Sequence, residues 1–329
     1  MTELSSVARR ASEPPVGQRR RTGRRASHRA AWLMLTPALA GLAIFFVYPL
    51  VANVYYSFTR YNLLQAPEWI GFRNYTYLFT KDPKVVAAAR NTLWLVVILV
   101  PVRIVTAMAM AGLLTRAKRA AGFWRTVFYL PALIPPVASI VAFVFLFNPG
   151  TGPVNAVLKL VGIKGPLWFN DPALAKPSLV LLGVWVMGDI MIIFLASLLD
   201  VPQEQHEAAA LDGANAAQRI RYVTLPHLRP VLLFAIVIGV IDTLQYFTEA
   251  AVASSVASGR SGVSVQLNQV LGYPRDSLLT YTEWLYVRGF SNFQLGYAAS
   301  LAVVLFVVTG VFLALLLRRF GAFSPDGRV

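Results

Sequence analysis

Four ionisable residues lie inside apolar stretches of the sequence: Arg103, Asp189, Asp242 and Glu249. A charged side chain is costly inside a lipid bilayer, so it usually faces a cavity or an opposite charge. Asp242, Gln245, Tyr246 and Glu249 recur at helical spacing, and their polar groups can hydrogen-bond hydroxyls. We expect these residues, together with Asp189, either to line a translocation path or to join neighbouring helices by hydrogen bonds.

A second group of candidate functional residues lies in the segment 200–226, which is too polar to cross a membrane. Asp200 and Gln203 have the spacing of a helix-starting capping box. The alanine-rich stretch that follows favours a helix, and Gly213 then provides the freedom for a sharp turn before a second short helix from about Ala214. The sequence predicts a helix, a tight turn and a helix.

The predicted first helix of this segment carries small and acidic residues side by side. Ala208 and Ala209 would let another protein's backbone approach closely, while Glu207 and Asp212 offer charge for hydrogen bonds to a basic partner. This pattern predicts a docking surface for another protein. The alternative is an ordinary amphipathic cytoplasmic hairpin with no partner.

The composition indicates a membrane protein that positions these groups on helices. Hydrophobic residues make up 57% of the chain and charged residues 14%, against about 25% charged in an ordinary soluble domain. We predict an all-α polytopic membrane protein with about six spans. The predicted spans are residues 31–58, 92–114, 127–147, 179–199, 231–251 and 295–317. Pro131, Pro135 and Pro136 predict a break or kink in the third span.

The distribution of positive charge predicts the orientation. The formal net charge is +15, but the arginines concentrate in the first 30 residues and in the segments between spans two and three and between spans four and five. By the positive-inside rule both termini are cytoplasmic, and no nucleic-acid partner is expected. We divide the chain into a disordered Arg-rich tail at 1–30, a transmembrane domain at 31–320 and a cytoplasmic tail at 321–329.

Several kinds of chemistry have no support in the sequence. The chain has no cysteine, so it has no disulfide, thiolate metal site or cysteine nucleophile. It has no G-x-x-x-x-G-K-[ST] loop to hold nucleotide phosphates. Its three histidines, His28, His206 and His227, do not form a plausible metal or catalytic cluster. We therefore expect no catalytic residue, metal or cofactor, and do not predict an enzyme.

The segment 200–226 resembles the EAA signature of permease subunits in binding-protein-dependent ABC importers. The matching positions are Glu207, Ala208, Ala209, Asp212, Gly213, Ala214, Leu225 and Pro226. Further positions are similar to the carbohydrate branch, which includes maltose and glycerol-3-phosphate permeases. These are Pro37, Tyr48-Pro49, Ser57-Phe58, Asn74-Tyr75, Leu130-Pro131, Pro135-Pro136, Asn155, Trp185 and Gly296-Tyr297-Ala298. The residues from Ala253 to Arg260 depart from the branch, which usually has a Thr-Gly-Gly-Gly-Pro-like turn there.

The resemblance implies an inner-membrane permease for a sugar or sugar-like solute. It implies that a coupling loop at about 200–229 docks a separate ATPase, with Glu207 pairing with a basic groove and Gly213 forming the turn. The implied partners are a second homologous permease, two copies of a cytoplasmic ATPase, an extracytoplasmic solute-binding protein and membrane lipid. The outer loops, such as 260–292, are expected to be broad and polar and to receive the binding protein.

Three other classes of protein stay open at this point. An ion-coupled secondary transporter would be expected to show inverted repeats, and the sequence has no clear internal repeat. An intramembrane enzyme would need a convergent nucleophile and base or a metal pair. An ABC permease for phosphate, amino acids or polyamines would share the docking loop but fits the flanking residues less well.

Overall fold

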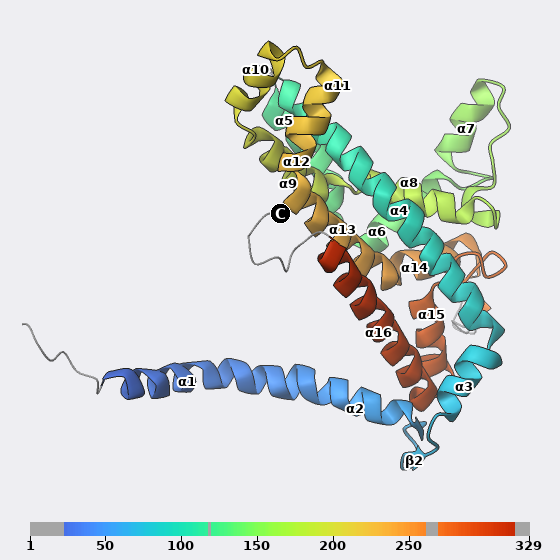
Figure 1. The fold of residues 1–329 in the computed structure, drawn as a ribbon. Coiled ribbons are helices and arrows are strands. Elements are labelled where there is room, and N and C mark those ends of the chain that lie inside the picture. Colours follow the sequence, from blue (N-terminus) through green and yellow to red (C-terminus); the bar gives the residue numbers. More distant parts are fainter. Residues whose placement is uncertain (1–22, 118–119, 261–268, 320–329) are drawn as a thin grey trace, which may run out of the picture. The chain divides into compact units, whose positions relative to one another are not determined.

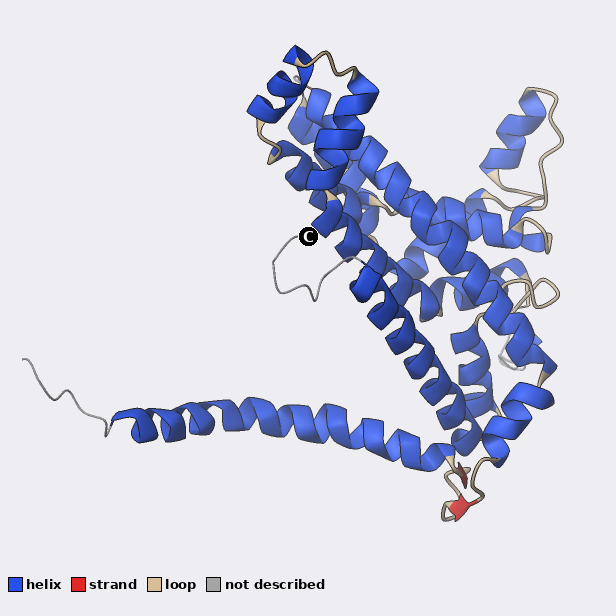
Figure 2. Cartoon of the chain, viewed as in Figure 1, coloured by secondary structure: helices blue, strands red, loops and turns tan. Residues whose placement is uncertain are grey.

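The computed structural model describes residues 23–117, 120–260 and 269–319 and is almost entirely helical (Figures 1 and 2). The chain divides into two compact units, residues 1–52 and 53–329. The first contains α1 (Gly23–Leu42), the π-helical turn η1 (Ala43–Val47) and the start of α2 (Tyr48–Ser57). α1 begins inside the segment predicted as a disordered tail. The rest of that tail and the tail at 321–329 lie outside the described residues.

The second unit holds the remaining elements. In chain order they are β1 (Thr59–Arg60), β2 (Glu68–Trp69), α3 (Arg73–Thr80), α4 (Pro83–Arg116), α5 (Ala121–Tyr129), η2 (Leu130–Leu133), α6 (Pro136–Leu146), α7 (Pro153–Leu160), η3 (Trp168–Asn170), α8 (Ala175–Trp185), α9 (Gly188–Leu199), α10 (Gln203–Leu211), α11 (Ala216–Arg219), η4 (Ile220–Thr224), α12 (Leu225–His227), α13 (Arg229–Leu244), α14 (Thr248–Ala257), α15 (Tyr281–Tyr286), η6 (Val287–Ser291) and α16 (Leu295–Arg319). The two strands form a small antiparallel hairpin in which Thr59 pairs with Trp69.

Three described helices are long and apolar enough to cross a membrane: Trp32–Ser57, Pro83–Arg116 and Leu295–Arg319. Three bent pairs pass the same test together: Ala121–Leu133 with Pro136–Leu146 at 97°, Ala175–Trp185 with Gly188–Leu199 at 47°, and Ala216–His227 with Arg229–Leu244 at 68°. Counted as single spans, these pairs bring the total to six. This agrees with the predicted all-α polytopic class.

The predicted break in the third span is confirmed at its prolines. Pro131 is the second residue of the 3₁₀ turn η2, and Pro136 is the first residue of α6. Proline has no N–H to donate and clashes with the preceding turn, so it fits best in the first turn of a helix and favours a bend elsewhere. The 97° bend between the two segments falls at this point.

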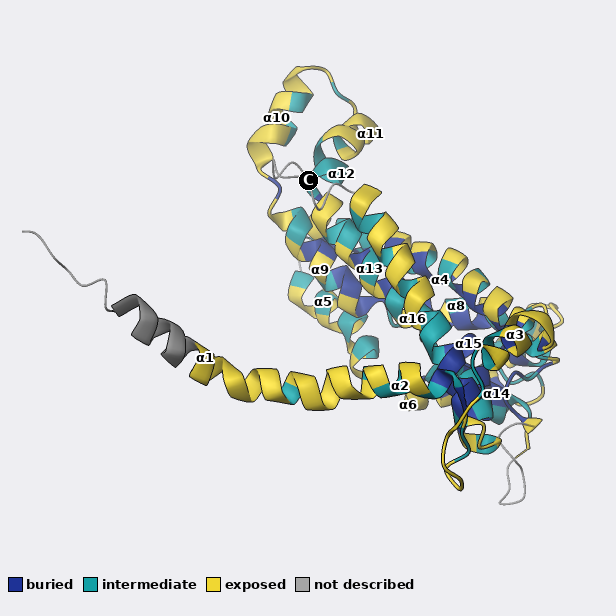
Figure 3. Ribbon diagram, turned by 60° about the horizontal axis from the view of Figure 1, so that its bottom comes forward, coloured by how far each residue is buried: buried dark blue, intermediate teal, exposed yellow. Residues whose placement is uncertain are grey.

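Helix α4 is the central element of the core. It packs against α8, α9 and α13, and its buried face includes Leu95, Leu99, Ile104 and Ala107. Figure 3 shows the buried residues concentrated along α4, α9 and α13 and around α15, while α10 and α11 are largely exposed. The small residues of α4 bring neighbouring helices close, as in membrane helix packing generally.

The segment predicted as a broad polar outer loop at 260–292 is instead folded core over much of its described length. Leu271, Leu279, Tyr281, Trp284 and Val287 are all buried and pack in one cluster. Its short helix α15 begins at a capping box formed by Thr280 and Glu283. The prediction of a polar loop was wrong because the apolar stretches of this segment are too short to be recognised as a membrane span. Those apolar residues are nevertheless buried against other helices. Residues 261–268 lie outside the described residues.

Candidate functional site

The segment 200–229 folds as the predicted helical hairpin. Helix α10 and the run of α11, η4 and α12 form its two arms, and Figure 1 shows them at one end of the second unit, above α9 and α5. The two arms contact each other. The polar segment between the apolar helices α9 and α13 therefore forms an ordered surface.

The turn of this hairpin depends on Gly213. Its φ is +79°, a left-handed conformation that residues with a Cβ rarely adopt. The Gly213 N–H donates to the Ala210 carbonyl at 3.1 Å, and the Ala214 N–H donates to the Ala209 carbonyl at 2.9 Å. These two bonds form the Schellman motif that satisfies the last carbonyls of a helix. Glycine is needed here for its backbone conformation, since a Cβ would meet no atom within 4 Å.

The capping box predicted at Asp200 is wrong, although the helix starts where expected. Asp200 is the C-cap of α9, and Pro202 is the N-cap residue of α10, with no side-chain cap. The capping box of the hairpin lies in its second arm, which begins at Ala216 rather than Ala214. There Asn215 and Gln218 exchange side-chain to backbone hydrogen bonds at 2.8 and 2.9 Å. Capping spacings are short and frequent, so the spacing of Asp200 and Gln203 alone could not establish a cap.

Half of the residues predicted to dock a partner are exposed on the hairpin, while Ala214, Leu225 and Pro226 are half-buried and Leu225 lines a groove shared with α4. Glu207, Ala208 and Asp212 are exposed, and Ala209 is half-buried. Leu211 between them is 90% exposed, a site that sequence reasoning treated only as a helix former. A leucine so exposed on an ordered tip is a candidate anchor for a partner's apolar pocket. In the sequence, the only indication of this exposure was that Leu211 directly precedes the predicted turn at Asp212-Gly213.

The second candidate site centres on an ion pair between α4 and α9, in which the Arg103 side chain is 21% exposed and the Asp189 side chain 51% exposed. Arg103 on α4 donates through one terminal nitrogen to both carboxylate oxygens of Asp189, at 2.9 and 2.8 Å. Asp189 lies in the first turn of α9, just past the bend after α8. The start of α9 packs closely against the end of α5, where a Cβ at Gly188 would collide with the Phe128 carbonyl. The local chain path thus holds the carboxylate against α4.

Two cavities adjoin this ion pair. One, of about 180 Å³, is lined by Arg103, Asp189, Tyr246 and Glu249 among others. The other, of about 220 Å³, is lined by Arg103, Asp242, Gln245, Tyr246 and Glu249 among others. All five residues predicted for a translocation path therefore line one cavity or the other. Arg103, noted in the sequence only as an intramembrane charge, lines both.

The predicted fifth span is wrong at its end. Helix α13 stops at Leu244, and α14 starts at Thr248, so Gln245 and Tyr246 lie in a break. Asp242 and Glu249 are consequently on different helices rather than on one continuous face. Within the hydrocarbon region of a membrane, non-helical backbone is tolerated only when it is buried in protein or lines a cavity. Here it lines the cavities beside Arg103.

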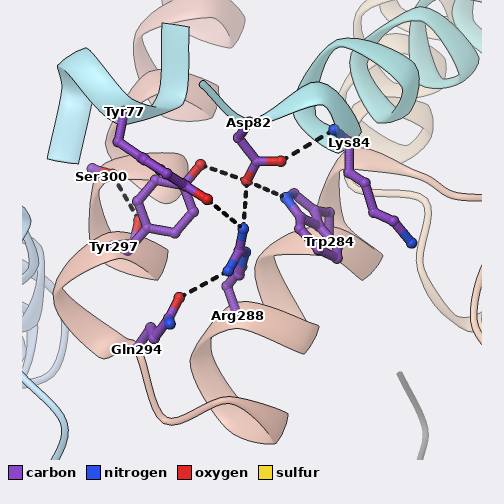
Figure 4. Close-up of polar contacts among 8 residues, drawn as sticks. All are labelled: Tyr77, Asp82, Lys84, Trp284, Arg288, Gln294, Tyr297 and Ser300. Carbon is purple, nitrogen blue, oxygen red and sulfur yellow. Dashed lines mark hydrogen bonds and ion pairs between the residues drawn. The ribbon is translucent and has the colours of Figure 1, made fainter. Parts of the chain in front are cut away.

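A third polar cluster, which sequence reasoning missed, joins the start of α4 to α15, η6 and α16 (Figure 4). Asp82 precedes α4, and its side chain is 1% exposed. One carboxylate oxygen accepts from Trp284 at 3.0 Å, Arg288 at 2.9 Å and Tyr297 at 2.9 Å, while the other accepts from the Lys84 N–H at 3.1 Å. The guanidinium of Arg288 also lies over the Trp284 ring, 4.6 Å from its centroid.

The electrostatics of this cluster favour its charged form. Burial raises the pKa of Asp82, but the hydrogen bonds from Trp284, Tyr297 and Arg288 outweigh that effect and bring the pKa below its ordinary value. Burial lowers the pKa of Arg288, and its bonds to Tyr77 and Asp82 more than reverse this. The cluster is therefore a buried ion pair in which both Asp82 oxygens accept hydrogen bonds and both terminal nitrogens of Arg288 donate them. The one feature of this cluster that the sequence could have indicated is Asp82 as a helix N-cap, because it directly precedes Pro83 at the first position of α4.

Two positions that carried the family resemblance have structural roles near this cluster. A Cβ at Gly296 would collide with the Thr59 carbonyl, so glycine is required where β1 crosses the start of α16. The Asn74 side-chain amide donates to the Ser57 and Thr59 carbonyls, both at 2.9 Å. These contacts fix the small hairpin against α3 and α16.

Residues 103–322 match the family described as the binding-protein-dependent transport system inner membrane component, and the chain belongs to that family. It is 36% identical to the probable ABC transporter permease protein YesP of Bacillus subtilis, over 88% of this chain and 89% of that protein. It is 29% identical to the arabinooligosaccharides transport system permease protein AraP of Bacillus subtilis, over 91% of this chain and 90% of AraP. The predicted resemblance to binding-protein-dependent permeases is confirmed.

The fold is also that of a solved permease. A chain from the crystal structure of a bacterial ABC transporter that imports the acidic polysaccharide alginate superposes with a TM-score of 0.74. The match covers 92% of this chain and 98% of the other, at 21% sequence identity. At that identity the likeness establishes the shared architecture.

Proposed function

We propose that this chain is a membrane-spanning permease subunit of an ATP-driven importer for a sugar or sugar-like solute. The observation that carries the proposal is the ordered hairpin at 200–229, which presents Glu207, Leu211 and Asp212 to solvent on a scaffold of the permease family. Its relatives include a permease named for arabinooligosaccharides, and one for lactose in Rhizobium radiobacter. These names support a carbohydrate solute.

In this proposal the hairpin docks a separate cytoplasmic ATPase. Leu211 enters an apolar pocket of the ATPase, Glu207 and Asp212 pair with basic residues around it, and the small Ala208 allows close approach. Gly213 holds the two arms at a fixed angle. Because the second arm continues through α12 into α13, movement of the hairpin is passed to a helix that ends beside the central cavities.

The solute path runs past the ion pair of Arg103 and Asp189. Asp242, Gln245, Tyr246 and Glu249 supply acceptors and donors for sugar hydroxyls in the cavities described above. A second homologous permease completes the path, and an extracytoplasmic binding protein delivers the solute. Both termini and the hairpin face the cytoplasm, in accordance with the positive charge around them.

The docking role is tested by a double variant, Glu207→Ala with Gly213→Pro. Proline cannot adopt the positive φ of Gly213, so the variant disrupts the turn as well as one charge. We expect loss of solute uptake and of ATPase co-purification while the chain is still inserted in the membrane. The matched control is Lys159→Ala with Gly162→Pro, which changes a charge in the last turn of α7 and a glycine of similar φ, +76°, just after that helix. Normal uptake in the first variant would contradict the docking role.

The path is tested separately with Asp242→Asn and Glu249→Gln. Both keep the size of the side chain but change its hydrogen-bonding capacity, so we expect slower uptake with unchanged ATPase co-purification. The measurement is uptake of candidate sugars into proteoliposomes that contain the whole importer. Unchanged uptake for every transported sugar would assign these residues to helix packing instead.

A further inference from the structure

A groove of about 570 Å³ lies between the second half of α4, the end of α9 and the hairpin. It is separate from the cavities at Arg103, and no residue lines both. One wall is the outward face of α4, where Val105 is 57% exposed and Leu113 is 61% exposed. Leu198 of α9 and Ile220 of η4 contribute to the other walls. The body of the groove is apolar.

The rim of the groove carries positive charge. Arg116 at the end of α4 and Arg219 at the end of α11 both line it, together with the imidazole of His206. No Asp or Glu is among the lining residues. The Nε atom of Arg219 is buried and has no hydrogen-bond partner within the described residues. The groove thus combines an apolar channel with two lining guanidinium groups, which are the side chains best suited to hydrogen-bond a phosphate.

The dimensions of the groove match one leaflet of a bilayer. From Val105 to Arg116 α4 advances eleven residues, which is about 16 Å at 1.5 Å per residue. Half the hydrocarbon thickness of a bilayer is about 15 Å. Since α4 crosses the membrane and Arg116 is its last residue, the arginine rim lies at the level of the lipid headgroups when Val105 is near the midplane.

We propose that this groove binds one anionic phospholipid of the phosphatidylglycerol type. An acyl chain lies along Val105, Met108 and Leu113, and the phosphate accepts hydrogen bonds from Arg116 and Arg219. The lipid joins a spanning helix to the hairpin and so stabilises the hairpin on the membrane side. The site depends only on the spanning of α4; its assignment to the cytoplasmic leaflet rests on the proposed function.

The experiment uses the full chain purified with its partner subunits in mild detergent. Native mass spectrometry follows retention of added phosphatidylglycerol against phosphatidylcholine. The test variant is Arg116→Gln with Arg219→Gln. Its control, Arg318→Gln with Arg319→Gln, removes the same charge at the end of α16, outside the groove. A second variant, Ala109→Trp, keeps both arginines and fills the apolar channel, because Ala109 lines the groove and is exposed.

We expect the arginine variant to bind phosphatidylglycerol roughly tenfold to thirtyfold more weakly, given the attraction of each cation for an anionic headgroup. Ala109→Trp should also lose the lipid, while the control variant should retain it. Equal losses in the test and control variants would show only diffuse attraction and overturn the proposal, and so would equal retention of phosphatidylcholine. A photo-crosslinker at position 109 that captures a peptide of another subunit, rather than a phospholipid, would assign the groove to that subunit.

Discussion

At the scale of single residues, the buried Asp82 determines how the start of α4 is held. Three side-chain donors from α15, η6 and α16 converge on one of its oxygens. A buried charge that is fully hydrogen-bonded is tolerated, but removing one member of the pair leaves the other uncompensated. The cluster therefore makes the junction of these elements depend on a single carboxylate.

We predict that Asp82→Asn lowers the free energy of unfolding by about 3–5 kcal/mol, because Arg288 is left buried without its counter-ion. The measurement is denaturant or thermal unfolding in detergent. Asp276→Asn is the control, since Asp276 pairs with Lys84 at 3.3 Å with both side chains more than 40% exposed, and such pairs contribute about 0–1 kcal/mol. Equal destabilisation by the two variants would contradict the proposed importance of the cluster.

Glu283 on α15 makes the stability of this region depend on pH. Burial raises its pKa from 4.5 to about 8, although hydrogen bonds from Thr280 oppose the shift. Since the folded-state pKa lies above the unfolded value, the stabilising contribution is complete below the unfolded pKa. It is lost as pH rises through the folded pKa of about 8.

We predict that Glu283→Gln removes this loss, because an amide of the same shape has no proton to release. The variant should therefore become more stable than the parent chain as pH rises toward and past about 8, when unfolding is measured as a function of pH. Glu68→Gln, at an exposed pair with Arg60, should follow the parent chain at every pH. A pH dependence identical in Glu283→Gln and the parent chain would be the contrary result.

At the scale of elements, the breaks between helices matter as much as the helices. The segment at 121–146 bends at its prolines, the next span bends by 47° just before Gly188, and the break at 245–247 separates Asp242 from Glu249. Each break leaves polar backbone that a cavity or neighbouring side chains must satisfy. The polar residues of the proposed path gather at such breaks.

The hairpin gives the prediction at this scale. Leu211→Ala should weaken ATPase co-purification at least several-fold, because it truncates the most exposed apolar side chain on the hairpin tip, while the Schellman turn stays intact. Leu64→Ala, which truncates a leucine that is 87% exposed in another loop, should have no effect. Undiminished ATPase recovery with Leu211→Ala would show that the tip is not an anchor.

At the scale of the whole molecule, the orientation in the membrane decides whether the hairpin at 200–229 faces the cytoplasm, where an ATPase could bind it. The chain has no cysteine, so single cysteines can be introduced at Ala210 on the hairpin and at Leu64 in the loop before β2. We predict that an impermeant maleimide labels the Leu64→Cys variant in intact cells and labels Ala210→Cys only after permeabilisation. The reverse pattern would invert the proposed topology and exclude ATPase docking at the hairpin.

The sequence alone determined the features that depend on composition and on local spacing. Long apolar runs require membrane spans, prolines require breaks, and a glycine after an alanine-rich helix predicts the left-handed turn found at Gly213. The signature at Glu207 to Pro226 was enough to identify the family. These properties depend on neighbours a few residues apart along the chain.

Only the tertiary structure decided which distant residues meet. The partners of Asp82 lie more than 200 residues away along the chain, and Arg103 and Asp189 are 86 residues apart. It also showed that α13 ends at Leu244 and that the residues after it line a cavity. Contacts of this kind depend on how helices pack in three dimensions, and periodicity along a single chain carries no record of that packing.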